Sequence, residues 1–328
     1  MKMMKKKYFL LGSLLILVFS ACKKADYPIE DASSYTKVFM QLANNGVIEN
    51  KMAIEDSWQR FGFGAGCGGV ELLSQDIEIG FKIDEEAIAE YNQGNATNYS
   101  LAPEGSFRLT EDKVTIPGGA TGSNTIYLEV NPFNLQGTKE YLIPISITSN
   151  SANLPITEGL GTTYYLVSGF YENNPFEPYS QENWTIHDYS DDENDGATTG
   201  GRAHHAIDGN IVTLWHSQWR KDENGWRPGH PHFIAIDMHE TLTLHGIKIY
   251  GRVGSKYAYL FPKDVFVETS MDGENWTPAG TYTLTASADD TSATMYFAKN
   301  VQAQYFKFTT LSSKGGGATT AVTEIVAF

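Results

Sequence analysis

The sequence has few cysteines and few basic residues, and its first half has no histidine. Its 328 residues include two cysteines, 24 basic and 39 acidic residues, and the formal charge is −15. A surface of this charge repels phosphate backbones, which argues against nucleic acid as a partner. No histidine precedes His187, so no imidazole in the first half can activate Cys67 as a nucleophile.

Motifs of the common enzyme classes are also missing. The sequence has no nucleophile elbow, no phosphate-binding loop and no HExxH or Cys/His cluster, and His230 and His232 are expected to pack at the start of a strand. Carboxylates are abundant, but no motif selects the pair that a glycosidase needs. At ~100–200 residues per domain the chain is long enough for two domains, and neither half has room for a (β/α)₈ barrel. A protein without enzymatic activity is expected.

The only long apolar run lies at the N-terminus. It covers residues 8–21, follows several lysines and ends in Ser20 and Ala21 directly before Cys22. The run is shorter than the ~20 residues of a membrane span, which favours a leader over a membrane anchor. The cysteine after it resembles the lipobox of bacterial lipoproteins. That resemblance implies removal of residues 1–21, a lipid on Cys22, a tether over residues 22–35 and a place in the bacterial outer membrane, at the cell surface.

The rest of the composition is typical of β-sheet proteins. Hydrophobic residues make up 41% of the chain, which is too many for a disordered protein, and aromatic residues make up 12%. A short helix is expected over 84–91, with Asp84 as its cap and Gly94 as its stop, and the glycine-rich stretch 62–69 is expected to be flexible. An immunoglobulin-like β-sandwich is therefore predicted over 36–168, with strands at 37–42, 77–83, 113–116, 125–130, 141–147 and 163–167.

A linker over 169–180, with two prolines, separates this half from a second one at 181–328. The second half holds all eight histidines and five of the six tryptophans, which suggests a recognition surface. An acidic run at 191–196 is expected to be a solvated loop. The pattern predicts an eight-stranded jelly-roll sandwich, with strands at 233–238, 242–250, 265–270, 281–285, 293–298, 305–310 and 322–328 and a tight turn at 271–274.

Three motifs of the second half carry a family resemblance. They are AIDGNIVTLWHS at 206–217, SMDGENW at 270–276 and EIVAF at 324–328. Their order and spacing resemble the discoidin domain, also called the coagulation factor five/eight type C domain. The family implies a galactose-binding-like jelly roll and includes the family 32 carbohydrate-binding modules. In this family Trp215 and Trp276 are expected in the core.

The first half is similar to another family. Its motifs are KID at 82–84, AEYN at 89–92, VTIPGG at 114–119 and YLIPI at 141–145. They resemble the domain of unknown function 1735, which occurs near the N-terminus of Bacteroidetes surface lipoproteins that handle glycans. This resemblance supplies context and implies no site.

Candidate sugar-binding residues follow from the discoidin resemblance. Protein sites bind sugars by placing an aromatic face against the apolar side of the ring and hydrogen-bonding groups on the hydroxyls. In family 32 modules a histidine, a tryptophan three residues later and an arginine further on converge, and His216, Trp219 and Arg252 match that pattern. The family's asparagine is replaced by Tyr257, and Trp226 is a second aromatic candidate on a long insertion. The competing interpretation is that these aromatics are core residues.

A calcium site is expected beside them. Calcium takes six to eight oxygens from carboxylates, hydroxyls and carbonyls, and the turn from Asp208 to Thr213 offers all three kinds. The resemblance implies a structural cation held by Asp208, Thr213 and Glu324, with carbonyls near His205 and Asn210 filling the shell. The alternative is a turn closed by hydrogen bonds alone.

These expectations describe a lipoprotein without enzymatic activity that binds glycans. Its partners would be an oligosaccharide or polysaccharide, the outer membrane and subunits of a glycan-uptake complex. Two alternatives remain open: an adhesin for proteins or lipids, with Leu260 and Phe261 as an apolar loop tip, and an enzyme or enzyme accessory that acts on glycosides.

Overall fold

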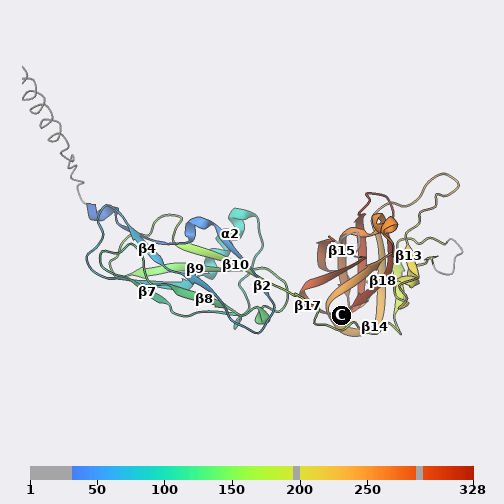
Figure 1. Cartoon of the computed structure of the whole chain (residues 1–328), viewed down its shortest axis with the longest axis horizontal. Coiled ribbons are helices and arrows are strands. Elements are labelled where there is room, and N and C mark those ends of the chain that lie inside the picture. The colour runs from blue at the N-terminus through green and yellow to red at the C-terminus, as the bar shows by residue number, and fades with distance from the viewer. Residues whose placement is uncertain (1–31, 195–199, 286–290) are drawn as a thin grey trace, which may run out of the picture.

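The structure is a computed structural model that describes residues 32–194, 200–285 and 291–328. Two β-domains follow one another along the chain (Figure 1). The predicted leader and Cys22 lie outside the described residues. Within the described ranges no helix is long and apolar enough to cross a membrane.

The N-terminal domain packs three small sheets around one core. A five-stranded sheet has the order β2-β10-β9-β5-β7, a three-stranded sheet the order β3-β8-β6, and β1 pairs with β4. The strands are β1 (Lys37–Met40), β2 (Val47–Ala53), β3 (Gln59–Phe63), β4 (Ala65–Gly68), β5 (Ile77–Ile83), β6 (Phe107–Leu109), β7 (Lys113–Ile116), β8 (Ile126–Val130), β9 (Tyr141–Asn150) and β10 (Thr162–Phe170).

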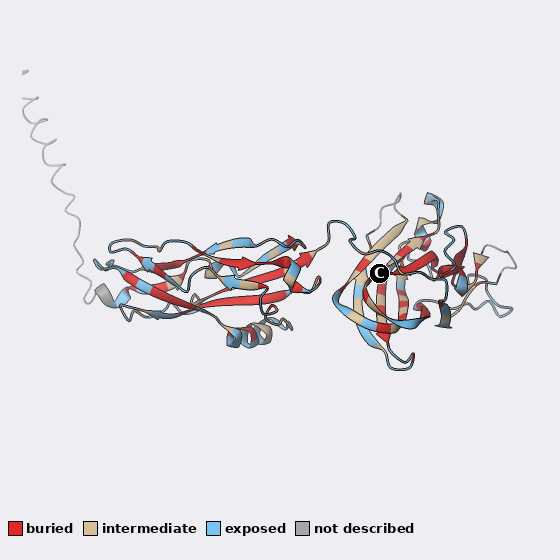
Figure 2. Cartoon of the chain, turned by 90° about the horizontal axis from the view of Figure 1, so that it is seen from below, coloured by how far each residue is buried: buried red, intermediate tan, exposed pale blue. Residues whose placement is uncertain are grey.

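Burial follows from the position of each strand. In the edge strand β7 exposed and buried residues alternate, because one face meets the core and the other meets solvent. The central strand β9 is buried over its first seven residues, because the helix α2 (Glu85–Asn95) covers its outer face through Ile88 against Leu142. Figure 2 shows the buried residues along the inside of this domain. Gly94 does not stop the helix, which ends at Asn95 and is capped by Ala96 in a left-handed conformation with φ +54°.

The stretch 62–69, expected to be flexible, is mostly β-strand. Its residues form the end of β3 and all of β4, where Cys67 pairs with Val38 of β1. Cys67 is 2% exposed, and this burial raises the pKa of its thiol. The residue is therefore an unreactive part of the core.

The C-terminal domain is a β-sandwich whose hydrogen bonds run continuously from strand to strand in the order β12-β13-β18-β14-β17-β15-β16, with β11 beside β14. The strands are β11 (Thr185–Tyr189), β12 (Gly200–Gly201), β13 (Leu214–His216), β14 (His232–Gly251), β15 (Pro262–Ser270), β16 (Thr277–Thr283), β17 (Ser292–Ser313) and β18 (Ala321–Ala327).

Two long strands belong to both faces of this sandwich. The first part of β14 pairs with β11 on one side and with Tyr305 to Thr310 of β17 on the other, and β17 in turn pairs with β15. The second part of β14 pairs with β18. Register shifts after Asp237 and Leu244 mark where β14 bends. The four strands expected at 233–238, 242–250, 293–298 and 305–310 are thus two. The expected fold class, an all-β chain that ends in a jelly roll, is confirmed.

Several aromatic and apolar residues lie where the sequence did not place them. Trp215 is fully buried, as expected, but Trp276 is only partly buried and lies under the ammonium group of Lys307, which is 4.3 Å from the ring centroid. Leu260 and Phe261 are 2% and 5% exposed. They pack in the domain interior and form no apolar tip.

An aromatic joint connects the domains. The Tyr171 ring lies 4.6 Å from that of Tyr296, and Phe176 stacks on His245 with a centroid distance of 3.9 Å. Beside these rings Gly137, at φ +127°, lies so close to β17 that a Cβ atom would be 2.7 Å from a carbonyl oxygen. The linker is therefore packed on the C-terminal domain.

Candidate functional site

His216 lies at the end of β13, next to the last strand of the jelly roll, where it pairs with Ala321. It is 8% exposed, and its ring Nδ1 lies 2.6 Å from the carbonyl oxygen of Ser217, to which it donates. Burial, and then the positive charge of Arg252, lower the pKa of the imidazole. His216 is therefore neutral at pH 7, with Nε2 as its hydrogen-bond acceptor.

Arg252 lies directly after β14 on the same end of the domain. Its guanidinium carbon is 3.6 Å from the ring centroid of Tyr257, which belongs to the short helix η5 (Ser255–Leu260) and packs against Leu214. A guanidinium held against an aromatic ring keeps its N–H groups available as donors. Tyr257, which stands where the family has an asparagine, therefore holds the Arg252 side chain.

Trp219 presents its ring at the surface of the adjoining loop and is 43% exposed. Its backbone is fixed, since the amides of Trp219 and Arg220 donate to one carboxylate oxygen of Glu193 at 2.9 and 2.8 Å, and Arg227 donates to the Trp219 carbonyl at 3.1 Å. The Arg220 guanidinium lies 5.1 Å from the centroid of the indole. A fixed backbone under an exposed ring is what stacking on a sugar requires.

The acidic run is not a solvated loop, which corrects the expectation from its charge. The side chains of Asp191, Asp192 and Glu193 are only 10%, 11% and 6% exposed. Asp191 accepts from the amide of Gln218 at 2.6 Å, and its carbonyl oxygen accepts from the indole nitrogen of Trp215 at 3.0 Å. The run therefore anchors the loop that carries Trp219. Its last residues, 195 and 196, lie outside the described residues.

A buried ion pair lies beneath this anchor. His232 is fully buried, with Nδ1 2.8 Å from a carboxylate oxygen of Asp191 and Nε2 2.7 Å from the carbonyl oxygen of Ala318. Burial lowers the pKa of His232, but the bonds to Asp191 and Ala318 outweigh it and raise the pKa. Both ring nitrogens face acceptors, so His232 is an imidazolium ion. The sequence predicted packing here but gave no sign of the ion pair.

Trp226 lies apart from these residues on the same loop. It is 63% exposed, and the turn that carries it is closed by Asp222, which accepts from the Trp226 amide at 2.8 Å. The described contacts bring His216, Arg252 and Tyr257 together and connect Trp219 to them through Glu193. Trp226 has no described contact with that group.

The residues expected to bind calcium form a second group. The Thr213 hydroxyl lies 2.8 Å from both carboxylate oxygens of Asp208 and 2.7 Å from the carbonyl oxygen of Asn210. Glu324 of β18 is 3% exposed, and neither of its carboxylate oxygens has a hydrogen-bond partner. His205 is buried in the helix η4 (Ala203–Ala206), and no described contact joins its carbonyl oxygen to the group.

The negative charge of Glu324 is unfavourable in this group, because the side chain is buried near the carboxylate of Asp208. Burial, and to a lesser extent the Asp208 charge, raise the pKa of Glu324 to about 7, although Gln181 and nearby amides lower it in part. A buried carboxylate without a partner is costly unless a proton or a cation neutralises it. Among the described residues no cluster of three or more His, Cys, Asp or Glu side chains is placed to bind a metal. This group has two carboxylates with a hydroxyl and a carbonyl, a donor set that suits calcium.

Two family models match the chain. Residues 33–154 match a family described as an N-terminal domain, and residues 185–325 match the F5/8 type C domain. The C-terminal domain is therefore an F5/8 type C, or discoidin, domain.

Curated relatives share part of the chain. A sialidase of Micromonospora viridifaciens is 26% identical over 236 residues, which cover 65% of this chain and 34% of the sialidase. A galactose oxidase of Gibberella zeae is 28% identical over 152 residues, 45% of this chain and 20% of the oxidase. The chain thus spans about a third or less of the length of these relatives.

Solved structures also match the chain, and each is matched over nearly all of its own length. The C-terminal domain of a chitobiase from Bacteroides fragilis is 29% identical with a TM-score of 0.40, over 46% of this chain and 97% of that one. A family 32 carbohydrate-binding module of Clostridium perfringens, solved with galactose, is 21% identical with a TM-score of 0.37, over 46% and 96%. A two-domain protein of unknown function from Bacteroides fragilis covers 92% of this chain and all of its own length, with 15% identity and a TM-score of 0.35.

Proposed function

We propose that this protein is a cell-surface lipoprotein without enzymatic activity whose discoidin domain binds glycans. One observation carries the proposal: an exposed tryptophan on a fixed loop, Trp219, lies at the end of the domain that also presents His216 and Arg252. Trp219 offers a stacking face, Arg252 offers N–H donors, and neutral His216 offers an acceptor for a hydroxyl. The small number of polar groups favours modest affinity for one sugar unit. Trp226 extends the surface toward a longer glycan.

We also propose a calcium ion at Asp208, Thr213 and Glu324, with backbone carbonyls near Asn210 and His205 as further ligands. The unpartnered Glu324 carboxylate supports it, because a divalent cation would neutralise both carboxylates at once. When bound, the ion would stabilise the fold. It would hold the 208–213 turn against β18 and take no part in sugar chemistry.

A glycan array tests the sugar proposal. The soluble chain from Ala25 onward, which keeps both domains, is applied to immobilised oligosaccharides, and selective signals on a sugar class are expected. Release of labelled sugar from those glycans would instead support an enzyme. Signals on immobilised proteins or vesicles with none on glycans would support the adhesin, whose expected apolar tip at Leu260 and Phe261 is buried.

Lipid attachment at Cys22 is a separate expectation. Cells that express the full chain should incorporate radiolabelled palmitate into it, because the thiol of Cys22 follows a leader that resembles a lipobox. The change Cys22→Ala should remove the label and release the protein from the membrane fraction. Label retained in that variant would contradict the anchor and, with it, the proposed outer-membrane location and any role beside a glycan-uptake complex.

A further inference from the structure

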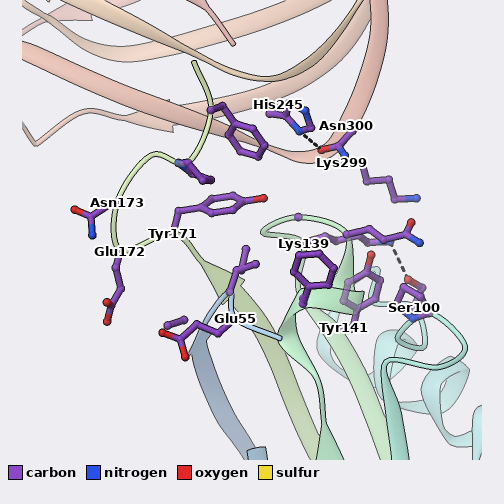
Figure 3. Close-up of a pocket in the computed structure, with 18 of the residues that line it drawn as sticks. Glu55, Ser100, Lys139, Tyr141, Tyr171, Glu172, Asn173, His245, Lys299 and Asn300 are labelled. Atoms are coloured by element: carbon purple, nitrogen blue, oxygen red, sulfur yellow. Dashed lines mark hydrogen bonds between the residues drawn. The ribbon is translucent and has the colours of Figure 1, made fainter. Parts of the chain in front are cut away.

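A cavity of about 920 Å³ lies where the two domains meet (Figure 3), and no residue of the Trp219 loop lines it. The N-terminal domain, the linker and the bend of β17 all contribute to its walls. Since no single domain forms this cavity, neither family resemblance assigns it a role.

Two lysines from different domains share one side of the cavity. Lys139 lies just before β9, where its ammonium group donates to the hydroxyl of Ser100 at 2.8 Å and lies 5.1 Å from the centroid of Tyr141. Lys299 lies on the exposed bend of β17. Burial, and then the positive charge of Lys299, lower the pKa of Lys139, so the two cations repel one another.

The two positive charges have no described carboxylate against them, although the chain has far more acidic than basic residues. Neither lysine forms an ion pair with a described residue, although Glu55 and Glu172 also line the cavity. Figure 3 shows both glutamates at the side away from the lysines. One side of the cavity is therefore free to attract an anion.

The remaining lining suits a sugar ring. Phe133 is 60% exposed and Tyr171 is half-buried, so each offers an apolar face. Nδ1 of His245 donates to the side-chain oxygen of Asn300 at 2.9 Å, which orients the amide of this lining residue and leaves its N–H groups as donors. Aromatic faces, amide donors and paired cations together match a sugar that carries a negative group.

We propose that this interdomain cavity binds an anionic sugar, with its carboxylate or sulfate between Lys139 and Lys299 and its ring against Tyr171 and Phe133. The site is independent of the proposed glycan site on the discoidin domain, because the two share no residue. It also makes the linker a wall of a binding site.

Calorimetric titration of the full chain tests this site with three probes. Tetragalacturonate carries carboxylates only, galactose 6-sulfate carries a sulfate only, and galactotetraose is neutral. Saturable binding of either anionic probe is expected, with affinity that falls as NaCl rises from about 50 to 500 mM, since salt screens charges that solvent reaches, and Lys299 is exposed. Which of the two binds identifies the anion.

Variants locate the binding. Lys299→Gln and Lys139→Gln should each weaken binding of the anionic probe at least tenfold, which corresponds to loss of one charged hydrogen bond, and Lys299→Glu should abolish it. Lys37→Gln, at an exposed lysine of β1, should leave it unchanged. Because Lys299 is exposed, its variants should fold, and the salt series on the parent chain needs no variant at all.

Three results would overturn the proposal: no saturable binding of either anionic probe, binding of the neutral probe by Trp219→Ala that equals its binding of the anionic probe, or unchanged binding by both Lys299 variants. Trp219→Ala should bind the anionic probe as the parent does. Loss of binding in that variant would place the anionic sugar at the discoidin site and reject the cavity, whereas failure of the discoidin site alone leaves the cavity result intact.

Discussion

Replacing Trp219 or Arg252 with alanine should abolish measurable glycan binding. Loss of a stacked ring costs ~1–3 kcal/mol and loss of a charged hydrogen-bond donor ~1.5–3 kcal/mol, so each change lowers a modest affinity by roughly 10- to 100-fold. Arg252 lies over Tyr257 and Trp219 is held by Glu193 through its backbone, so neither substitution removes a core contact. Titration with the best glycan of the array measures the loss.

The control for these variants is Trp58→Ala. Trp58 is 37% exposed in the N-terminal domain, so it matches Trp219 in residue type and exposure but lies outside the proposed site. It should bind the glycan as the parent does. Equal binding by Trp219→Ala, Arg252→Ala and the parent would move the site elsewhere, and Trp226→Ala would then be the variant to examine.

Calcium should raise the melting temperature of the C-terminal domain by roughly 10 °C or more. A ligand that binds only the folded state adds RT ln(1 + [L]/Kd), or about 4 kcal/mol for millimolar calcium at a micromolar site, and about 1 kcal/mol shifts a domain of this size by several degrees. Glu324→Gln should remove most of the shift, whereas Glu274→Gln, at an exposed glutamate of the same domain, should keep it. Equal melting in chelator and in calcium would reject the site.

The same carboxylate gives a pH dependence with a definite sign. The pKa of Glu324 is about 7 in the folded chain against 4.5 as its reference, so the folded state binds this proton more tightly than the unfolded state. Without calcium, stability should fall as pH rises from about 4.5 to 7, by about 3 kcal/mol in total. Calcium needs the deprotonated carboxylate, so its stabilisation should grow over the same range. Urea denaturation at pH 5 and pH 7.5 measures both, and Glu324→Gln should flatten both.

Much of the architecture could be predicted because local pattern decides it. The strands at 77–83 and 113–116 match β5 and β7, since their alternation reflects one buried face. The sequence could not show that 233–238 and 242–250 form one strand. Polar residues interrupt the apolar pattern at Asp237 to Thr241, but the backbone hydrogen bonds resume after a register shift, and only the pairing with β17 reveals it.

The anchor of the site was beyond sequence reasoning for a different reason. A run of acidic residues normally faces water, because burying a carboxylate is costly. Asp191 and Glu193 are buried because amides of residues 218–220 and the imidazolium of His232 lie against them. Those partners are distant in sequence, so no local pattern signals them. The exposure of Trp219 follows from the same contacts.

The aromatic joint between the domains has a mechanical consequence. A flexible linker lets each domain rotate independently, so a force applied to one domain first extends the linker and only then acts on the other domain. Here Phe176 is stacked on His245, and Gly137 lies directly against Ala298, so turning one domain against the other requires rings and backbone to separate. A sideways load at the Trp219 end is therefore expected to reach the N-terminal domain as torque through these contacts.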